Sequence, residues 1–368
     1  MPKPLYVLSP CGTSLLTNGA NDEQRKLVVK YANTKSLEEI SEKDRKTLQD
    51  RTEIVGSNLE KADNSSAARM SAELNGIIKL CEGSFNHRQD YHLLLCTDTW
   101  LGETTANLVE SWLKKQQLSV EVKRQSDLRT EDINSFQLAL SDLVQWCEQI
   151  IPGYRRNGYH VVFNLTGGFK SVQGFLQTLA TFYADETIYI FETATDLLRI
   201  PRLPVEMAAE STVEKNLETF RRLSLYLSIS NIADVPETLL IKVDEKVGFS
   251  PWGELVWAES KKKVYCKQLY SPPTDKLKYG SSFEKSIKGL PPDRLVQVNE
   301  KIDQLTKYLE TNNNQYNLSS LDFKELKGNP CPPSTHEIDA WSDQDAKRIF
   351  GHYAGDKFIL DKLDKGLH

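Results

Sequence analysis

The sequence lacks the long apolar runs and the one-sided charge that mark membrane proteins and bulk nucleic-acid binders. None of its 368 residues lies in a stretch near the roughly 20 apolar residues that span a bilayer. Met1–Leu8 is too short and too quickly polar for a signal peptide. We therefore expect a cytoplasmic protein with no membrane partner. The 46 Lys and Arg residues against 51 Asp and Glu residues give a net charge of −5, so contact with nucleic acid would need a local patch.

Paired cysteines are also missing. The six cysteines are scattered, with no C-x-x-C motif and no cysteine within three residues of a histidine. Several lie in apolar patterns typical of strands and helices, which favours buried, reduced thiols. From this spacing we expect no metal and no cofactor. The remaining composition, 39% hydrophobic and 26% charged, is that of a globular protein, and the length suggests two or three domains of roughly 150 residues.

Residues 1–205 alternate short apolar runs with amphipathic stretches. This alternation predicts strands joined by helices in a mostly parallel sheet. The predicted fold class is α/β, with a Rossmann-like first domain. Strands are expected at 4–9, 91–96, 119–124, 159–165 and 187–191, and helices within 22–82 and at 103–116, 131–151 and 171–183.

Small and polar residues follow three of these strands, at the edge where parallel sheets bind ligands. Thr166–Ser171 offers two glycines for close backbone approach, two hydroxyls, one lysine and the amino end of a helix. A tight strand-to-helix turn is the structural alternative, and the motif lacks the first glycine of G-x-x-x-x-G-K-[ST], which argues against a nucleoside triphosphatase. The candidate ligand-binding residues are Cys11, Gly12, Thr13, Ser14, Asp98, Thr99, Thr166, Gly167, Gly168, Lys170 and Ser171.

The pattern changes after residue 205. Residues 206–276 combine a helical stretch at 213–228 with short apolar segments broken by proline and glycine, which predicts a small winged-helix-like connector. Residues 277–368 predict a compact α+β domain: one long amphipathic helix, followed by antiparallel strands. The helix is expected at 293–309, and the strands at 323–326, 336–341, 347–353 and 357–362.

Two motifs of the first domain resemble those of CARF domains, the sensor domains of type III CRISPR accessory proteins. They are Gly12–Ser14 after the first strand and Asn164–Ser171 after a later one. The resemblance covers about the first 200 residues. It implies a homodimer that binds a cyclic oligoadenylate, for which we expect cyclic tetra-adenylate, across its two-fold axis.

Residues 277–368 resemble the RelE superfamily of mRNA interferases. The matching features are the long helix together with Phe283–Ser286, Phe323–Leu326, Lys347–Phe350 and Lys362–His368. The resemblance implies cleavage of mRNA in the ribosomal A site without a metal. In such a reaction the RNA 2′-OH attacks the neighbouring phosphorus, cations stabilise the phosphate, and a proton reaches the leaving oxygen.

Arg348 is the expected phosphate ligand, because it matches the arginine of the family's central strand and its planar fork can bind two oxygens. Lys347 and Lys365 would add positive charge, and His368 falls near the family's tail acid or base. His352, Tyr353 and His336 are further catalytic candidates, although surface positions in the fold explain them as well. Residues 276–368 contain 14 basic and 14 acidic residues, so RNA contact should depend on a few placed cations.

Together these features predict a ribonuclease that is activated by cyclic oligoadenylate and acts on ribosome-bound mRNA. The alternative is a ligand-responsive transcription regulator without nuclease activity, in which residues 206–276 bind DNA. That segment shows no recognition helix rich in Arg, Asn and Gln. The residues also leave open whether the sensor degrades its own ligand.

Overall fold

The computed structural model describes residues 3–85, 89–191, 196–229, 232, 234–243, 246–328 and 330–367. The chain forms two compact units, Met1–Glu206 and Met207–His368. Each has its own sheet and apolar core, and each is described by itself. Within the described residues, every helix is too short or too polar to cross a membrane.

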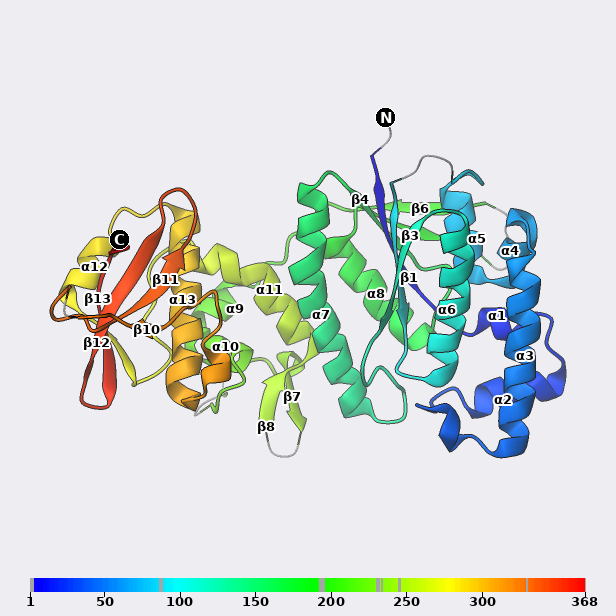
Figure 1. Cartoon of the computed structure of the whole chain (residues 1–368), viewed down its shortest axis with the longest axis horizontal. Helices are drawn as coiled ribbons and strands as arrows, with labels where there is room; N and C mark the ends of the chain where they lie inside the picture. The colour runs from blue at the N-terminus through cyan, green and yellow to red at the C-terminus, as the bar shows by residue number, and fades with distance from the viewer. Residues whose placement is uncertain are drawn as a thin grey trace. The chain divides into compact units, whose positions relative to one another are not determined.

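The first unit is built on a six-stranded sheet (Figure 1). Strands β1, β2 and β4 are nearly continuous apolar runs because helices cover both of their faces. The α/β class with a mostly parallel sheet is confirmed. The final strand was not predicted from the sequence; it lies at the edge, pairs antiparallel and exposes all four residues. The order across the sheet is β3 (Ser119–Arg124), β2 (Tyr91–Cys96), β1 (Leu5–Pro10), β4 (His160–Asn164), β5 (Glu186–Tyr189) and β6 (Leu198–Pro201).

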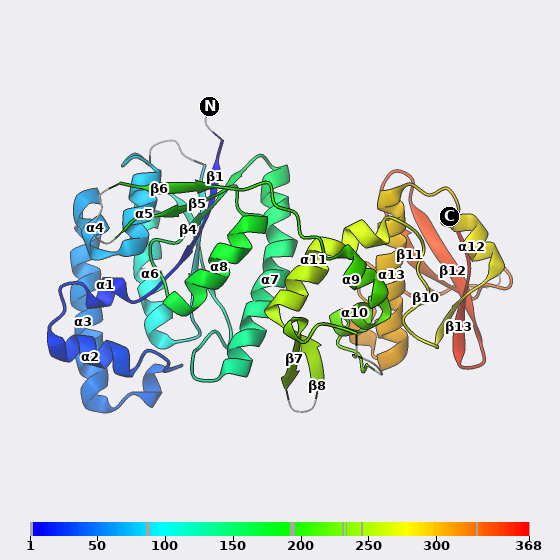
Figure 2. The same ribbon diagram turned by 180° about the vertical axis from the view of Figure 1, so that it is seen from behind.

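Two pairs of helices enclose this sheet (Figures 1 and 2). On one face Val7 packs with Leu80, and on the other the ring of Tyr6 lies 4.2 Å from that of Tyr154. The first pair is α5 (Ala72–Leu80) and α6 (Trp100–Lys115), and the second is α7 (Ile133–Arg156) and α8 (Lys170–Tyr183). Four helices form a further layer outside the first pair: α1 (Ser14–Thr17), α2 (Asp22–Lys30), α3 (Glu42–Glu60) and α4 (Asn64–Met70).

The second unit begins with three helices and a β-hairpin around an aromatic core of Phe220, Phe249 and Trp257. The single helix expected at 213–228 is instead two short ones. They separate at Asn216, whose side chain turns back to donate to the Thr212 carbonyl. The elements are α9 (Glu210–Lys215), α10 (Leu217–Ser224), β7 (Leu240–Val243), β8 (Lys246–Phe249) and α11 (Pro251–Tyr265).

The remainder of the second unit is a five-stranded sheet with two helices. Val298, Ile302 and Leu305 of the long helix pack into the core beneath the sheet. The strand order is β10-β11-β12-β13-β9, antiparallel except where β9 joins β13. The elements are β9 (Leu277–Tyr279), α12 (Ser281–Ile287), α13 (Pro292–Thr311), β10 (Lys324–Glu325), β11 (His336–Trp341), β12 (Lys347–Ala354) and β13 (Lys357–Lys365).

A buried ion pair joins the two parts of the second unit. Arg221 of α10 is 1% exposed, and its Nε donates to Oδ1 of Asp303 on α13 at 2.7 Å. The hydroxyl of Tyr265 on α11 donates to the other oxygen of Asp303. Because a buried charge is costly unless it is paired, α10, α11 and α13 depend on one another. The segments predicted as separate domains, 206–276 and 277–368, therefore lie in one compact unit.

Candidate functional site

The carboxyl ends of β1 and β4 lie at the point where the strand order of the first sheet reverses. The chain places β2 and β3 on one side of β1 and then returns to place β4 and β5 on the other. In open parallel sheets, ligands bind in the crevice outside the carboxyl ends of the strands beside such a point. Here the loops that follow β1 and β4 are Cys11–Thr13 and Leu165–Phe169, which contain most of the predicted ligand-binding residues.

The two loops contact each other directly through glycine backbone. A Cβ atom on Gly12 would lie 3.2 Å from the backbone of Gly168. Gly168 has a φ of +101°, and a Cβ there would lie 2.8 Å from Cβ of Pro10. Glycine is required at this position by both the left-handed backbone and the close approach. The structure thus brings together two of the three loops singled out in the sequence.

Glu73, on the first turn of α5, contacts both loops and holds them in position. Its side chain is fully buried; Oε1 accepts the Gly12 amide at 2.9 Å, and Oε2 accepts the hydroxyls of Ser14 at 3.0 Å and Ser71 at 2.6 Å. A Cβ on Gly167 would lie 2.3 Å from Oε1. The Ser14 hydroxyl, a predicted ligand group, is therefore committed to Glu73 and positions the loop.

Cys11 takes part in this edge of the sheet through its backbone. Its amide donates to the Leu95 carbonyl at 2.7 Å and so extends the pairing of β1 with β2. Burial, followed by the nearby negative charge of Glu73, raises the pKa of the Cys11 thiol. A thiol in this state is not a nucleophile at neutral pH. The role left to Cys11 is to shape the backbone of the loop.

The amino end of α8 faces the same edge of the sheet. This 14-residue helix begins after Phe169, whose side chain provides no capping hydrogen bond. Lys170 and Ser171 are exposed in its first turn, and Gln173 holds the preceding loop by donating to the carbonyls of Leu165 at 3.2 Å and Gly167 at 2.9 Å. Amide groups, the helix dipole and a lysine at one place favour an anion such as a phosphate.

Thr166 adds a hydroxyl to this loop. Its Oγ1 is buried and, among the described residues, has no hydrogen-bond partner. Its amide donates to Oδ1 of Asn164 at 3.3 Å, which fixes the residue at the end of β4. A buried hydroxyl without a partner is costly, and a ligand oxygen would satisfy it.

Asp98 and Thr99, the third predicted group, form the turn after β2. Asp98 is 4% exposed and binds Arg124 Nε at 2.8 Å, Lys35 Nζ at 3.0 Å and the Asp127 amide at 3.1 Å. Burial opposes its charge, but these partners outweigh it and hold the pKa of Asp98 below its ordinary value. Thr99 caps α6 by accepting the Gly102 amide at 3.0 Å. Both side chains are thus engaged with protein groups.

In the second unit, Arg348 lies on β12 among three carboxylates. Its Nη1 is 2.8 Å from Asp322 Oδ2, 2.9 Å from Asp339 Oδ1 and 3.5 Å from Glu337 Oε1. Burial opposes the charged form, yet the hydrogen bond that Arg348 donates to Asp322 and the neighbouring negative charges raise the pKa of Arg348 above its usual value. The guanidinium is permanently charged and partly exposed, and its near partners are carboxylates of this chain.

The other catalytic candidates separate into two groups along β12. Lys347, at its start, is paired in register with Lys365 of β13, and Lys347 Nζ lies 5.9 Å from the centre of the Trp341 ring. His352 and Tyr353 lie near its end, about 16 Å away for a five-residue separation in a strand. One phosphate cannot contact both groups. His368 lies outside the described residues.

The group at the end of β12 includes two histidines in different surroundings. His352 Nδ1 is 2.8 Å from Asp361 Oδ2, which also accepts the Ser334 hydroxyl at 2.7 Å. His336 stacks on Phe323 at 5.1 Å and meets Tyr353 edge to face at 5.3 Å. Burial lowers the pKa of His336 and raises the pKa of Tyr353. His352 is therefore oriented by a carboxylate, whereas His336 and Tyr353 form part of an aromatic cluster.

Fold and site together define the first unit as an α/β unit in which two glycine loops and the amino end of α8 meet at the carboxyl edge of the sheet. A family model described as "CRISPR-associated protein (Cas_APE2256)" matches residues 68–203. The matched region includes Glu73 and the Thr166–Ser171 loop. The match supports a CRISPR-associated protein. No curated protein matches the chain.

Proposed function

We propose that the first unit is a CARF sensor that binds cyclic oligoadenylate, with cyclic tetra-adenylate as the expected ring. The observation that supports this most strongly is the meeting of the Gly12 and Gly168 loops beside the uncapped amino end of α8. Amides, Lys170, Ser171 and the Thr166 hydroxyl would bind phosphate oxygens. A ring of two-fold symmetry is best bound by two copies of this crevice, so the sensor is a homodimer.

Binding of cyclic tetra- and hexa-adenylate to the purified chain tests this proposal. Lys170→Ala should weaken binding about ten-fold or more, because it removes a charge-assisted phosphate contact of about 1.5–3 kcal/mol. Lys46→Ala, which removes an exposed lysine of α3, is the matched control and should leave affinity unchanged. Failure of both rings to bind the wild-type chain would overturn the sensor assignment.

We further propose that residues 277–368 are a RelE-type nuclease that cleaves ribosome-bound mRNA. The placement of Arg348 supports this, since β12 is the middle strand of the five-stranded sheet. The RNA phosphate would bind the guanidinium, and Lys347 and Lys365 would add charge at that end of the strand. His352, held by Asp361, lies four residues along β12 from Arg348, roughly 13 Å away, so it would contact the RNA away from the phosphate that Arg348 binds.

The carboxylates around Arg348 supply a resting state for this nuclease. Oδ2 of Asp322 and Oδ1 of Asp339 lie 2.8 and 2.9 Å from Arg348 Nη1. A phosphate must displace these carboxylates to bind the guanidinium. Cyclic oligoadenylate would activate the enzyme by favouring an arrangement in which the RNA replaces these carboxylates. The neutral charge of residues 276–368 fits a nuclease that is correctly placed by the ribosome.

RNA cleavage assays with and without ribosomes, and with and without ligand, test the nuclease. Arg348→Ala should reduce cleavage about 100-fold or more, as expected for loss of a group that stabilises the transition state, and Arg348→Lys should restore only part of it. Lys357→Ala, at the far end of the β12–β13 hairpin, is the control. Unchanged cleavage in Arg348→Ala would refute the residue assignment, and equal cleavage without ribosomes would refute ribosome dependence.

The transcription-regulator alternative is less well supported by the second unit. On α10, Arg221 is bound to Asp303, and Arg222 donates to the carbonyls of Ser228 and Pro273. On α11, Lys261 and Lys263 pair with glutamates at 3.0 and 3.3 Å. Because these cations are engaged with protein groups, they are poorly available to DNA phosphates.

A further inference from the structure

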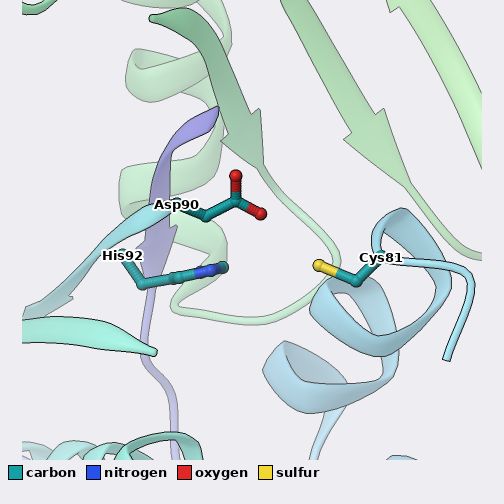
Figure 3. Close-up of side chains that lie close together, drawn as sticks. All are labelled: Cys81, Asp90 and His92. Carbon is teal, nitrogen blue, oxygen red and sulfur yellow. The ribbon is translucent and has the colours of Figure 1, made fainter. Parts of the chain in front are cut away.

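Three buried side chains of different chemistry converge at the end of α5 (Figure 3). They are Cys81, which follows the helix, and Asp90 and His92 at the start of β2. Their exposed fractions are 1%, 3% and 0%. Figure 3 shows the sulfur, the carboxylate and the imidazole directed toward a common centre, and one ligand atom from each lies within 4.8 Å of the others.

The cluster occupies the edge of the sheet opposite the ligand crevice. Asp90 and His92 lie where β2 begins, whereas the crevice forms where the parallel strands end. Asp90 also accepts the Leu5 amide through Oδ1 at 2.8 Å, which links it to the start of β1. The cluster therefore belongs to neither the proposed sensor site nor the proposed nuclease.

A thiol, an imidazole and a carboxylate could form either a nucleophilic triad or a metal site. A nucleophile must reach a substrate, and side chains that are at most 3% exposed exclude one. A metal ion and one water molecule need far less room than a substrate. Tetrahedral coordination at about 2.0–2.3 Å from the metal places ligand atoms about 3.3–3.8 Å apart, so side-chain movements of about 1 Å would bring these three to that geometry.

We propose that Cys81, Asp90 and His92 bind a structural zinc ion, with water at the fourth position. Thiolate, imidazole and carboxylate together match the borderline-soft character of Zn²⁺ and are a poor set for Mg²⁺ or Ca²⁺. The proposal replaces the expectation of no metal. That expectation came from the spacing of cysteines alone. These three ligands form a C-x8-D-x-H pattern, in which the cysteine follows the end of a helix and the other two ligands lie at the start of a strand.

Such an ion would fix the position of α5. Cys81 follows the carboxyl end of the helix, and Glu73, which supports both crevice loops, lies on its first turn. Joining the end of α5 to β2 restrains the helix on which Glu73 sits. Loss of the metal should therefore lower the stability of the first unit, since the ion binds the folded chain only.

Metal analysis of the full chain tests the proposal without reference to ligand binding or RNA cleavage. Protein purified from zinc-supplemented culture should contain about one zinc per chain. After chelation, Co²⁺ should restore one metal per chain and produce the absorption of a cobalt–thiolate bond and of a tetrahedral site. Absence of first-row metal from the purified protein, together with no cobalt–thiolate absorption on titration, would overturn the assignment.

Variants then identify the ligands. Cys81→Ser should abolish the cobalt–thiolate absorption. Asp90→Asn should weaken Co²⁺ binding about ten-fold or more, while the side-chain oxygen of the asparagine can still accept the hydrogen bond from the Leu5 amide. Cys147→Ser, at a buried cysteine of α7, is the control and should retain both metal and absorption. Full retention of the cobalt–thiolate absorption in Cys81→Ser would refute the site, and so would an equal loss of that absorption in Cys147→Ser. If a variant folds poorly, the wild-type titration still tests metal binding, because it involves no substitution.

Discussion

Gly167 lies where the loop after β4 passes over the carboxylate of Glu73. A methyl group at this position would lie 2.3 Å from Glu73 Oε1 and 2.7 Å from its Cγ. The carboxylate cannot move away without releasing the Gly12 amide and two serine hydroxyls. One side chain therefore ties the packing of the glycine loop to the position of both crevice loops.

Gly167→Ala should destabilise the first unit by about 1–3 kcal/mol, the usual cost of overpacking a tight site, and should weaken ligand binding. Chemical denaturation of the two proteins measures the first effect. Gly174→Ala is the control; its Cβ meets nothing within 4 Å on the exposed face of α8, so it should stabilise the helix by about 0.5–1 kcal/mol. Equal stability of Gly167→Ala and the wild type would show that the loop is not packed as described.

At the scale of elements, the second unit depends on a charge pair between helices. Arg221 on α10 donates to Asp303 on α13, and it also donates to the Ser271 carbonyl at 2.6 Å. Asp303 in turn accepts from Tyr265 of α11. These contacts join the helix–hairpin part to the part that contains the five-stranded sheet, which explains why the second unit is compact as a whole.

Asp303→Ala should destabilise the second unit by about 3–5 kcal/mol, because it leaves the Arg221 guanidinium buried without its counter-charge. Thermal and urea unfolding measure this loss. The double variant Arg221→Met, Asp303→Leu should recover much of it, since no charge then remains buried. Glu214→Ala, which breaks the exposed pair with Lys267, is the control and should change little. A similarly small effect of Asp303→Ala would contradict the burial of the pair.

At the scale of the whole molecule, the sensor that we propose would be completed by a second copy of the chain. One chain supplies one uncapped α8 and one pair of glycine loops, and a ring of adenylates presents its phosphates with two-fold symmetry. Calorimetry and sedimentation should therefore give one ring per two chains. At a ligand concentration 100 times the Kd, the bound state should gain about 2.7 kcal/mol of stability. One ring bound per monomeric chain would contradict the dimeric site.

Much of the architecture could be predicted because local patterns reflect burial. The strands predicted at 91–96, 119–124 and 336–341 match β2, β3 and β11 to the residue. A short run of apolar residues, or one that alternates apolar and polar residues, is most stable as a strand that buries its apolar side chains. β6 was missed because Leu198–Pro201 is only four residues long and exposed throughout, so its short alternation gives little signal of burial. The break at Asn216 was missed because it depends on a side-chain hydrogen bond within an otherwise helical stretch.

The positions of the two glycine loops could be predicted from the sequence because glycines and hydroxyls after buried strands are a local signal. Glu73 could not, because a glutamate in the first turn of a helix is ordinary until the loops above it are known. Arg348 was found from a resemblance, but its three carboxylate neighbours come from β11 and from the segment before β10. Such neighbours depend on strand register.

The sequence by itself determined the class of fold, the position of the two glycine loops and the absence of long apolar runs, because each depends on residues that are neighbours in the chain. Tertiary structure alone decided which side chains remain available. It committed Ser14 and Asp98 to protein partners, placed carboxylates on Arg348, and gathered Cys81, Asp90 and His92 at one buried point. The physical reason is that charge pairing and metal coordination act over a few ångströms in space, whatever the separation along the chain.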